Sequence, residues 1–268
     1  MALALWEGPG TPVLAVHATG FCKELWGPVA QLLRPHLVVA PDQRGHGDSS
    51  TPAPPYDWWD LGRDVLAVVA ACGLERPAAL GHSSGAAALV MAELLRPGTF
   101  SCLGLVEPII FDFPPARVED FPMTQAALRR RRSFPSPEAA VEALRGRGAF
   151  AWWDEAVLAL YAAHGLRREG EAWVLKCAPA IEAEFYRGAP AHGAWARLHE
   201  VACPVLLVAG AASDSHRAAF MEEMRARFGS ARLEVVPGAG HFLPMERPEA
   251  LAALVAPWFD REAGAAGR

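Results

Sequence analysis

The feature that most constrains the fold is a regular alternation between short apolar runs and longer segments with helical spacing of apolar residues. Short runs of this composition are typical of strands that are buried on both faces. The runs predicted to be strands are Pro12–His17, Leu37–Ala40, Ala78–Gly81, Cys102–Val106, Pro204–Ala209 and Arg232–Val236. Strands that alternate with helices indicate a parallel sheet. The sequence therefore predicts an α/β fold with a mostly parallel central sheet.

The segments between and after these runs are predicted to be the helices that cover both faces of the sheet. They are Trp26–Leu33, Trp58–Cys72, Gly85–Leu95, His216–Phe228 and Pro248–Phe259. Several begin near Asp or Pro and end near Gly, which is the order that helix caps favour.

The alternation stops between Phe111 and Glu200, where no further run of this kind occurs. This stretch contains Pro114-Pro115, Pro122 and Pro135-Ser136-Pro137, and prolines end or redirect regular structure. We interpret it as a helical insertion that forms a cap over the sheet. The predicted organisation is a core domain of residues 1–110 and 201–268 with a cap of residues 111–200.

The sequence Gly81-His82-Ser83-Ser84-Gly85 stands between a predicted strand and a predicted helix. A serine in a sharp strand-to-helix turn needs glycine two residues to each side, because the backbone before and after the turn comes close together. The turn lifts the serine hydroxyl clear of the sheet, and the next helix points its first N–H groups at developing negative charge. We predict that Ser83 is a catalytic nucleophile.

A serine hydroxyl near neutral pH needs a histidine to accept its proton and an acid to orient that histidine. His241 lies in a Gly-rich loop, Pro237-Gly238-Ala239-Gly240-His241, after the last predicted strand and before the last predicted helix. Such a loop can reach back over the sheet. We predict that His241 is the base.

Two carboxylates are candidates for the acid. Asp214 follows the strand Pro204–Ala209 and precedes His241, which gives the chain order Ser, Asp, His. Glu107 ends the preceding strand, and a carboxylate there can also reach the histidine. The order of the residues favours Asp214, and Glu107 stays as the alternative.

The oxyanion of acyl transfer needs two hydrogen-bond donors. One is expected to be the backbone N–H of Ser84, the residue after the nucleophile, and the other comes from the loop after the first predicted strand. We predict that Thr19 supplies it, with Ala18 and Gly20 as its competitors.

Three further stretches attract attention. Asp42–Ser49 is rich in charge and glycine, but its glycines lack the spacing of a dinucleotide site, so we interpret it as a tight turn held by local ion pairs. Arg129–Arg132 is interpreted as a solvated or ion-paired helix face, with an anion site as the alternative. Trp152 and Trp153 are predicted to bind substrate or to form the core of the insertion.

Composition narrows the classes of function. The net charge of -5 argues against a nucleic-acid partner. The chain shows neither a signal peptide nor an apolar run of about 18 residues, so we expect a cytoplasmic protein without a membrane partner. The five cysteines are scattered without metal-ligand spacing. The sequence therefore predicts neither a metal site nor a disulfide framework.

Taken together, four motifs resemble those of the α/β-hydrolase fold enzymes over nearly the whole chain. They are His17-Ala18-Thr19-Gly20-Phe21 with Trp26, the turn Asp42–Ser49, Gly81–Gly85, and Gly238–Phe242. The resemblance implies an eight-stranded, mostly parallel sheet with a helical cap after the sixth strand. It also implies cofactor-independent hydrolysis through an acyl-enzyme.

The chain departs from the family pattern at two places. Ala18 stands where the oxyanion loop usually has glycine, and the N-terminus starts close to the second strand, so the first antiparallel strand is expected to be absent. Ser83 excludes the branches with an aspartate nucleophile, which are similar to epoxide hydrolases and haloalkane dehalogenases. Glu107 nevertheless sits where some dehalogenase-like members place their acid.

From these observations we expect a serine hydrolase that cleaves an ester or related acyl bond of a small apolar substrate. A C–C bond hydrolase or a cofactor-free perhydrolase could use the same three residues. A non-catalytic scaffold that binds a small ligand is the alternative of another class.

Overall fold

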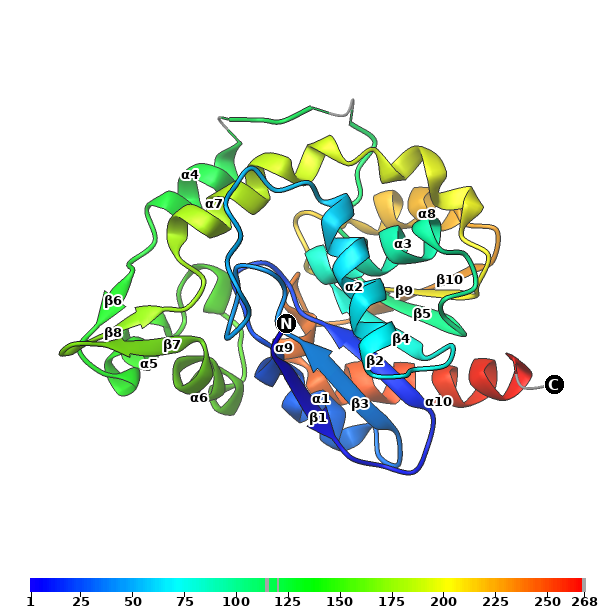
Figure 1. Cartoon of the computed structure of the whole chain (residues 1–268), viewed down its shortest axis with the longest axis horizontal. Helices are drawn as coiled ribbons and strands as arrows, with labels where there is room; N and C mark the ends of the chain where they lie inside the picture. The colour runs from blue at the N-terminus through cyan, green and yellow to red at the C-terminus, as the bar shows by residue number, and fades with distance from the viewer. Residues whose placement is uncertain (114–115, 120, 267–268) are drawn as a thin grey trace.

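The computed structural model describes residues 1–113, 116–119 and 121–266, and its centre is a seven-stranded sheet in the order β1-β3-β2-β4-β5-β9-β10 (Figure 1). These strands are β1 (Leu3–Trp6), β2 (Pro12–Val16), β3 (Leu37–Pro41), β4 (Ala78–His82), β5 (Cys102–Val106), β9 (Val205–Gly210) and β10 (Ala231–Val236). All neighbouring pairs are parallel except β1 and β3. The predicted mostly parallel sheet is confirmed.

The edge strand β1 is a difference from the sequence-based prediction, which contained no strand there. It runs antiparallel to β3, with Leu3 opposite Pro41 and Trp6 opposite Val38. As a short, half-buried edge strand it lacks the continuous apolarity of the central strands. The central sheet of the described residues thus has seven strands rather than the implied eight. Its N-terminal strand β1 is antiparallel, which differs from the expectation that the first antiparallel strand would be absent.

Helices cover both faces of the sheet, as predicted (Figure 1). On one face lie α2 (Trp59–Ala71), α3 (Ser84–Leu95) and α8 (Ala218–Arg227), and on the other lie α1 (Gly27–Leu32) and α10 (Pro248–Ala266). The one-turn helix α9 (Leu243–Glu246) precedes α10, and a 3₁₀ turn, η1 (Lys23–Trp26), precedes α1. Within the described residues, no helix has both the length and the apolarity needed to cross a membrane.

The alternation of side chains along the strands divides the core into two layers. In β2, Leu14 and Val16 pack with the helices α2 and α3, whereas Val13 and Ala15 pack with α1 and α10. Both sets are buried, which explains why these strands are apolar without interruption. The two layers hold the carboxyl ends of the strands in fixed positions.

The segment between β5 and β9 contains helices, as predicted, together with a small antiparallel sheet in the order β6-β8-β7, which was not predicted. Its elements are α4 (Pro122–Leu128), β6 (Ser133–Phe134), α5 (Pro137–Leu144), η2 (Gly148–Phe150), α6 (Glu155–His164), β7 (Leu166–Glu169), β8 (Ala172–Leu175), α7 (Pro179–Gly188), η3 (Ala189–Ala191) and η4 (Ala194–Glu200). Residues 114, 115 and 120 of this predicted insertion, including Pro114-Pro115, lie outside the described residues, as do residues 267 and 268 of the predicted core.

The insertion packs on the loop that follows β2. Phe21 in this loop lies edge-on to Trp153 and Tyr161, at ring-centroid distances of 5.1 and 5.8 Å. A second link joins α7 to the start of α2, where Trp58 Nε1 donates a hydrogen bond to the carbonyl of Phe185. The insertion therefore lies beside the carboxyl end of the central strands (Figure 1).

Candidate active site

Ser83 occupies a strained turn between β4 and α3, with φ 56° and ψ -115°. Side chains rarely adopt a backbone of this kind, and such strain is common at functional sites. A Cβ atom at Gly81 would lie 2.5 Å from Ala86 Cα, and one at Gly85 would lie 2.2 Å from the Val16 carbonyl oxygen. The structure therefore confirms the physical reason for a glycine on each side of the turn.

His241 lies on the loop between β10 and α9 and contacts two other predicted site residues. Its Nε2 atom is 3.3 Å from Ser83 Oγ, and its Nδ1 atom is 2.6 Å from Glu107 Oε2. Because an ionised carboxylate only accepts hydrogen bonds, Nδ1 carries the proton and Nε2 presents its lone pair to the serine. This tautomer is the one a general base requires.

Glu107 follows β5 with φ 45°, and its side chain is fully buried. Oε1 accepts a hydrogen bond from the Gly210 N–H at 2.8 Å, and Oε2 accepts one from the Ser213 hydroxyl at 2.7 Å. Burial would raise the pKa of this carboxyl, but hydrogen bonds from His216 and His241 outweigh burial and hold the pKa well below its ordinary value. Glu107 is therefore an ionised hydrogen-bond acceptor.

The expectation that Asp214 contacts His241 is not met. The β9 strand ends at Gly210, and the loop after it turns Ser213 toward Glu107 while Asp214 is exposed to solvent. Among the described residues, no hydrogen bond or ion pair joins the Asp214 carboxylate to His241. The carboxylate beside His241 belongs to Glu107, the alternative that the sequence left open.

A second histidine, His216, lies against the same carboxylate and was interpreted in the sequence only as the start of a helix. It is fully buried, its Nδ1 is 3.3 Å from Glu107 Oε2, and its Nε2 is 3.0 Å from the Pro108 carbonyl oxygen. Its ring stacks on that of His241, with centroids 5.5 Å apart and planes inclined by 17°. No local motif marks this residue, because only the folded chain brings it to Glu107.

His82, next to the nucleophile, holds the loop that carries His241. Its Nε2 lies 2.8 Å from the His241 carbonyl oxygen, so Nε2–H is the donor. Burial lowers the pKa of His82 to about 3, which keeps the ring neutral near pH 7. The turn and the histidine loop are thus joined by a hydrogen bond that is separate from the one between Ser83 and His241.

The backbone around Thr19 and Ser84 matches the predicted oxyanion site in part. Ser84 is the first residue of α3, so its N–H has no acceptor within that helix. Thr19 lines the same cavity as Ser83 and His241. The N–H of Gly20 donates a hydrogen bond to His46 Nε2 at 2.8 Å. This N–H is therefore not available as an oxyanion donor, which excludes Gly20 as an alternative to Thr19.

His17 holds the loop that is predicted to supply the second oxyanion donor. The Nδ1–H group of His17 donates to the Ala18 carbonyl at 2.8 Å, and its Nε2 accepts from the Gln43 N–H at 3.1 Å. The φ angle of Ala18 is not positive, so an alanine side chain fits at the position where the family usually has glycine. The departure at Ala18 is thus accommodated without backbone strain.

The turn Asp42–Ser49 supports this loop through local ion pairs, as predicted. The Lys23 ammonium lies 2.7 Å from Asp42 Oδ2 and 2.8 Å from Asp48 Oδ2. Gln43 Nε2 donates to the His17 carbonyl at 2.6 Å and to Ser84 Oγ at 3.2 Å. The turn thereby connects the loop after β2 with the start of α3.

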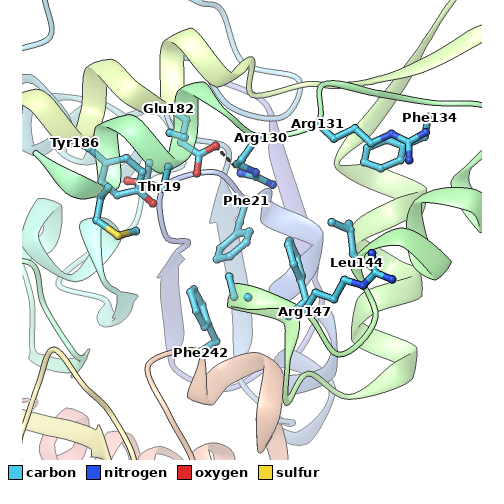
Figure 2. Close-up of a pocket in the computed structure, with 16 residues that line it drawn as sticks. Thr19, Phe21, Arg130, Arg131, Phe134, Leu144, Arg147, Glu182, Tyr186 and Phe242 are labelled. Atoms are coloured by element: carbon cyan, nitrogen blue, oxygen red, sulfur yellow. Dashed lines mark hydrogen bonds and ion pairs between the residues drawn. The ribbon is translucent and has the colours of Figure 1, made fainter. Parts of the chain in front are cut away.

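Two cavities lie next to these residues. The inner cavity, of about 170 Å³, is lined by Ser83 and His241 together with mainly apolar side chains that include Trp58, Ile109, Phe111 and Phe121. The outer cavity, of about 390 Å³, lies under the insertion and is lined by residues such as Phe21, Phe134, Phe150 and Phe242 (Figure 2). Both are concave and largely apolar, as small-molecule sites usually are.

The expected substrate contacts of Trp152 and Trp153 are not found. Among the described residues that line the two cavities, neither tryptophan occurs. Trp153 is buried in the core of the insertion, and its ring is 4.8 Å from that of Phe150. Trp152 is 57% exposed, and its ring lies against Gly240 on the histidine loop. Aromatic residues alone did not reveal which rings face the cavity.

Glu107, His216 and His241 also form a group whose ligand atoms lie within 4.8 Å of one another, a spacing that could suit a metal ion. The same atoms, however, already have partners, because His241 Nδ1 lies 2.6 Å from Glu107 Oε2 and His216 Nδ1 lies 2.9 Å from Ser215 Oγ as well as 3.3 Å from Glu107 Oε2. We therefore interpret the group as a hydrogen-bonded network.

Comparison with known proteins gives a consistent result. The model of the alpha/beta hydrolase family matches residues 13–254. RutD of Klebsiella pneumoniae (strain 342), whose name describes a carbamate hydrolase, is 28% identical over 262 residues, 90% of this chain and 88% of that protein. An abhydrolase domain-containing protein of Alternaria alternata is 25% identical over 219 residues, 68% of this chain and 82% of that protein. The structure of E-2-(acetamidomethylene)succinate hydrolase aligns with a TM-score of 0.81 at 23% identity, over 95% of this chain and 93% of that chain.

Proposed function

The chain belongs to the alpha/beta hydrolase family, and on this premise we propose that it is a serine hydrolase that cleaves an ester or related acyl bond through an acyl-enzyme. The observation that carries the proposal is the position of His241, whose ring lies between the Ser83 hydroxyl and the Glu107 carboxylate. In this proposal Ser83 is the nucleophile, His241 is the base, and Glu107 orients His241.

In the first half of the reaction, Ser83 Oγ attacks the carbonyl carbon of the substrate while His241 Nε2 takes the hydroxyl proton. The carbonyl oxygen becomes an oxyanion that accepts hydrogen bonds from the backbone N–H groups of Ser84 and Thr19. His241 then gives its proton to the leaving group as the tetrahedral intermediate collapses. The bond to the leaving group breaks, and the acyl group stays on Ser83.

In the second half, a water molecule attacks the acyl carbon and His241 takes its proton. Collapse of the second intermediate releases the carboxylic acid and returns the proton to Ser83. Glu107 stays ionised throughout and stabilises the imidazolium that His241 becomes in each half. Its depressed pKa supports this role.

The inner cavity supports a small apolar acyl group as the substrate part next to Ser83. Its walls are aromatic and aliphatic, and its volume of about 170 Å³ is small. Burial of an apolar group against such walls is favourable by roughly 25 cal/mol per Å² of area. We expect short and medium-chain esters to be better substrates than long-chain esters.

Covalent labelling tests the proposal directly. A fluorophosphonate is expected to label the folded protein with a stoichiometry near one. It should not label the Ser83→Ala variant. Ser101→Ala, which removes a buried serine hydroxyl elsewhere, is the matched control and should label like the parent. A folded protein that resists labelling would support a ligand-binding scaffold. Efficient cleavage of diketones with poor cleavage of 4-nitrophenyl esters would support a C–C bond hydrolase.

A further inference from the structure

The outer cavity lies next to the inner one, because four residues line both. Thr19, Met123, Tyr186 and Phe242 line both cavities. Two of these adjoin the reaction centre: Thr19 belongs to the oxyanion loop, and Phe242 follows His241. The outer cavity therefore adjoins the predicted reaction centre at Ser83 and His241.

The walls of the outer cavity are apolar, but its lining also contains three arginines and one glutamate (Figure 2). Arg130 and Glu182 form an ion pair with each other, and Arg130 Nη2 also donates to the Tyr161 hydroxyl at 2.9 Å. The carboxylate of Glu182 is thus already matched by one arginine. The remaining charge of the lining is positive and comes from Arg131 and Arg147.

Neither of these two arginines has a carboxylate partner in the part of the chain that the structure describes. The Arg131 guanidinium lies 4.8 Å from the ring centroid of Phe134, and its Nε donates to the Ser133 carbonyl at 2.9 Å, which leaves both Nη groups for another acceptor. By contrast, Arg145, which lies outside this lining, pairs with both Glu142 and Glu155.

The positions of the two arginines suit the far end of an extended ligand. In Figure 2, Arg131 and Arg147 lie at one end of the cavity, away from Thr19 and Tyr186 at the other. The apolar rings of Phe21 and Phe242 lie between these ends. Arg131 and Arg147 are both exposed to solvent, and a guanidinium with free N–H groups can bind a carboxylate or phosphate through charge-assisted hydrogen bonds.

We infer that the outer cavity receives an anionic arm of the substrate, a carboxylate or phosphate group at the end of an apolar stem, and that Arg131 and Arg147 bind this group. The inference rests on the proposed function in naming the substrate class of the same site. It favours half-esters of dicarboxylic acids, or esters whose leaving group carries an anion, over neutral esters of the same size. One arginine of the Arg129–Arg132 run, Arg131, would thus belong to an anion site, which was the alternative interpretation of this run from the sequence.

The experiment compares esters that differ in charge and in its position. The mono-4-nitrophenyl ester of adipic acid carries the anion on the acyl side, 4-carboxyphenyl hexanoate carries it on the leaving-group side, and 4-nitrophenyl hexanoate carries none. The selectivity is the kcat/KM of a charged ester divided by that of the neutral one. For at least one charged ester we expect this ratio to fall about tenfold or more in the double variant R131Q/R147Q, mainly through KM. The ester affected identifies the side that carries the arm.

Arg129→Gln is the matched control, because Arg129 belongs to the same exposed run but does not line the cavity. It should leave the ratio unchanged. An unchanged ratio for both charged esters in R131Q/R147Q, or an equal fall in R129Q, would overturn the inference.

Binding separates this inference from the proposed function. In Ser83→Ala protein, calorimetry should show that monomethyl adipate binds more tightly than methyl hexanoate, and that the difference is lost in the R131Q/R147Q background. This result would support the anion site even if no ester were hydrolysed. The same comparison of 4-carboxyphenyl hexanoate with phenyl hexanoate tests an arm on the leaving-group side. Equal binding within both pairs of esters by the Ser83→Ala protein would refute the site while leaving the hydrolase proposal intact.

Discussion

His241 Nδ1 lies 2.6 Å from Glu107 Oε2, and this contact joins the loop after β10 to the end of β5. The β5 strand neighbours β9, so an acid at the end of either strand lies at the same edge of the sheet. Here the backbone of β9 supports Glu107, since the Glu107 N–H donates to the Val208 carbonyl and the Gly210 N–H donates to Oε1. The proposed acid, Glu107, is therefore held by the sheet rather than carried on a surface loop.

Substitution of the two carboxylates should have very different effects. Glu107→Gln keeps the shape of the side chain but removes the charge that stabilises the His241 imidazolium, so we expect kcat to fall by about 10³- to 10⁴-fold. Asp214→Asn changes an exposed side chain and should leave kcat within about twofold. Steady-state kinetics with a 4-nitrophenyl ester measure both. A large loss in Asp214→Asn with little change in Glu107→Gln would contradict our assignment.

The contrast between Glu107 and Asp214 shows where sequence patterns stop being informative. The Ser83 turn could be predicted because its requirement is local: two glycines prevent clashes within a few residues of the serine. His241 could be predicted because its loop is Gly-rich and follows the last strand. The acid depends on which way the loop after β9 turns, and this is decided by contacts such as Ser213 with Glu107.

The insertion was the least predictable part for the same reason. The strand β6 is two residues long and pairs with residues about forty positions further along the chain, so no periodic pattern marks it. Trp152 and Trp153 are adjacent in sequence, yet one is exposed and the other is buried. Composition alone could not separate a ring that packs inside the insertion from one that faces a ligand.

Gly85, two residues after Ser83, should be essential for stability. In Gly85→Ala the new Cβ would meet the backbone oxygen of Val16 at 2.2 Å, and neither a strand of the central sheet nor a fully buried helix can move away easily. We expect a loss of about 3 kcal/mol or more in the free energy of unfolding, measured by urea denaturation. Gly229→Ala is the control, because nothing lies within 4 Å of its Cβ position, and it should change stability by less than about 1 kcal/mol.

Buried neutral histidines should make the protein sensitive to mild acid. Burial lowers the pKa of His46 and His82 to about 3 and that of His192 to about 4. A histidine in the unfolded chain titrates near 6.5, so below that pH the unfolded state binds more protons than the folded state. The stability that depends on these neutral rings is present above about pH 6.5 and is lost as the pH falls toward the folded pKa values.

The expected slope can be measured and assigned. Well below pH 6.5, each of these histidines should lower the free energy of unfolding by about 1.4 kcal/mol per pH unit, as followed by urea denaturation between about pH 7 and pH 5. His46→Gln keeps an acceptor for the Gly20 N–H but cannot titrate. The slope of the free energy of unfolding against pH should therefore decrease by about 1.4 kcal/mol per pH unit. His164→Gln, at a side chain that is 44% exposed, is the control for an unchanged slope. An identical slope in His46→Gln and the parent would show that His46 is not neutral when buried.

The hydrogen bond from His82 to the His241 carbonyl should matter for the rate more than for substrate binding. His82→Leu removes the donor, so the His241 loop loses its link to the Ser83 turn and Nε2 is less well aligned with Oγ. We expect kcat to fall by about tenfold or more while KM for a small ester changes little, because His82 does not line either cavity. His82→Gln, whose amide can donate in the same direction, should recover part of the loss. Titration of active sites with a fluorophosphonate gives the concentration of folded enzyme, from which kcat is calculated for each variant. Equal kcat values in His82→Leu and the parent would show that His82 has a purely structural role.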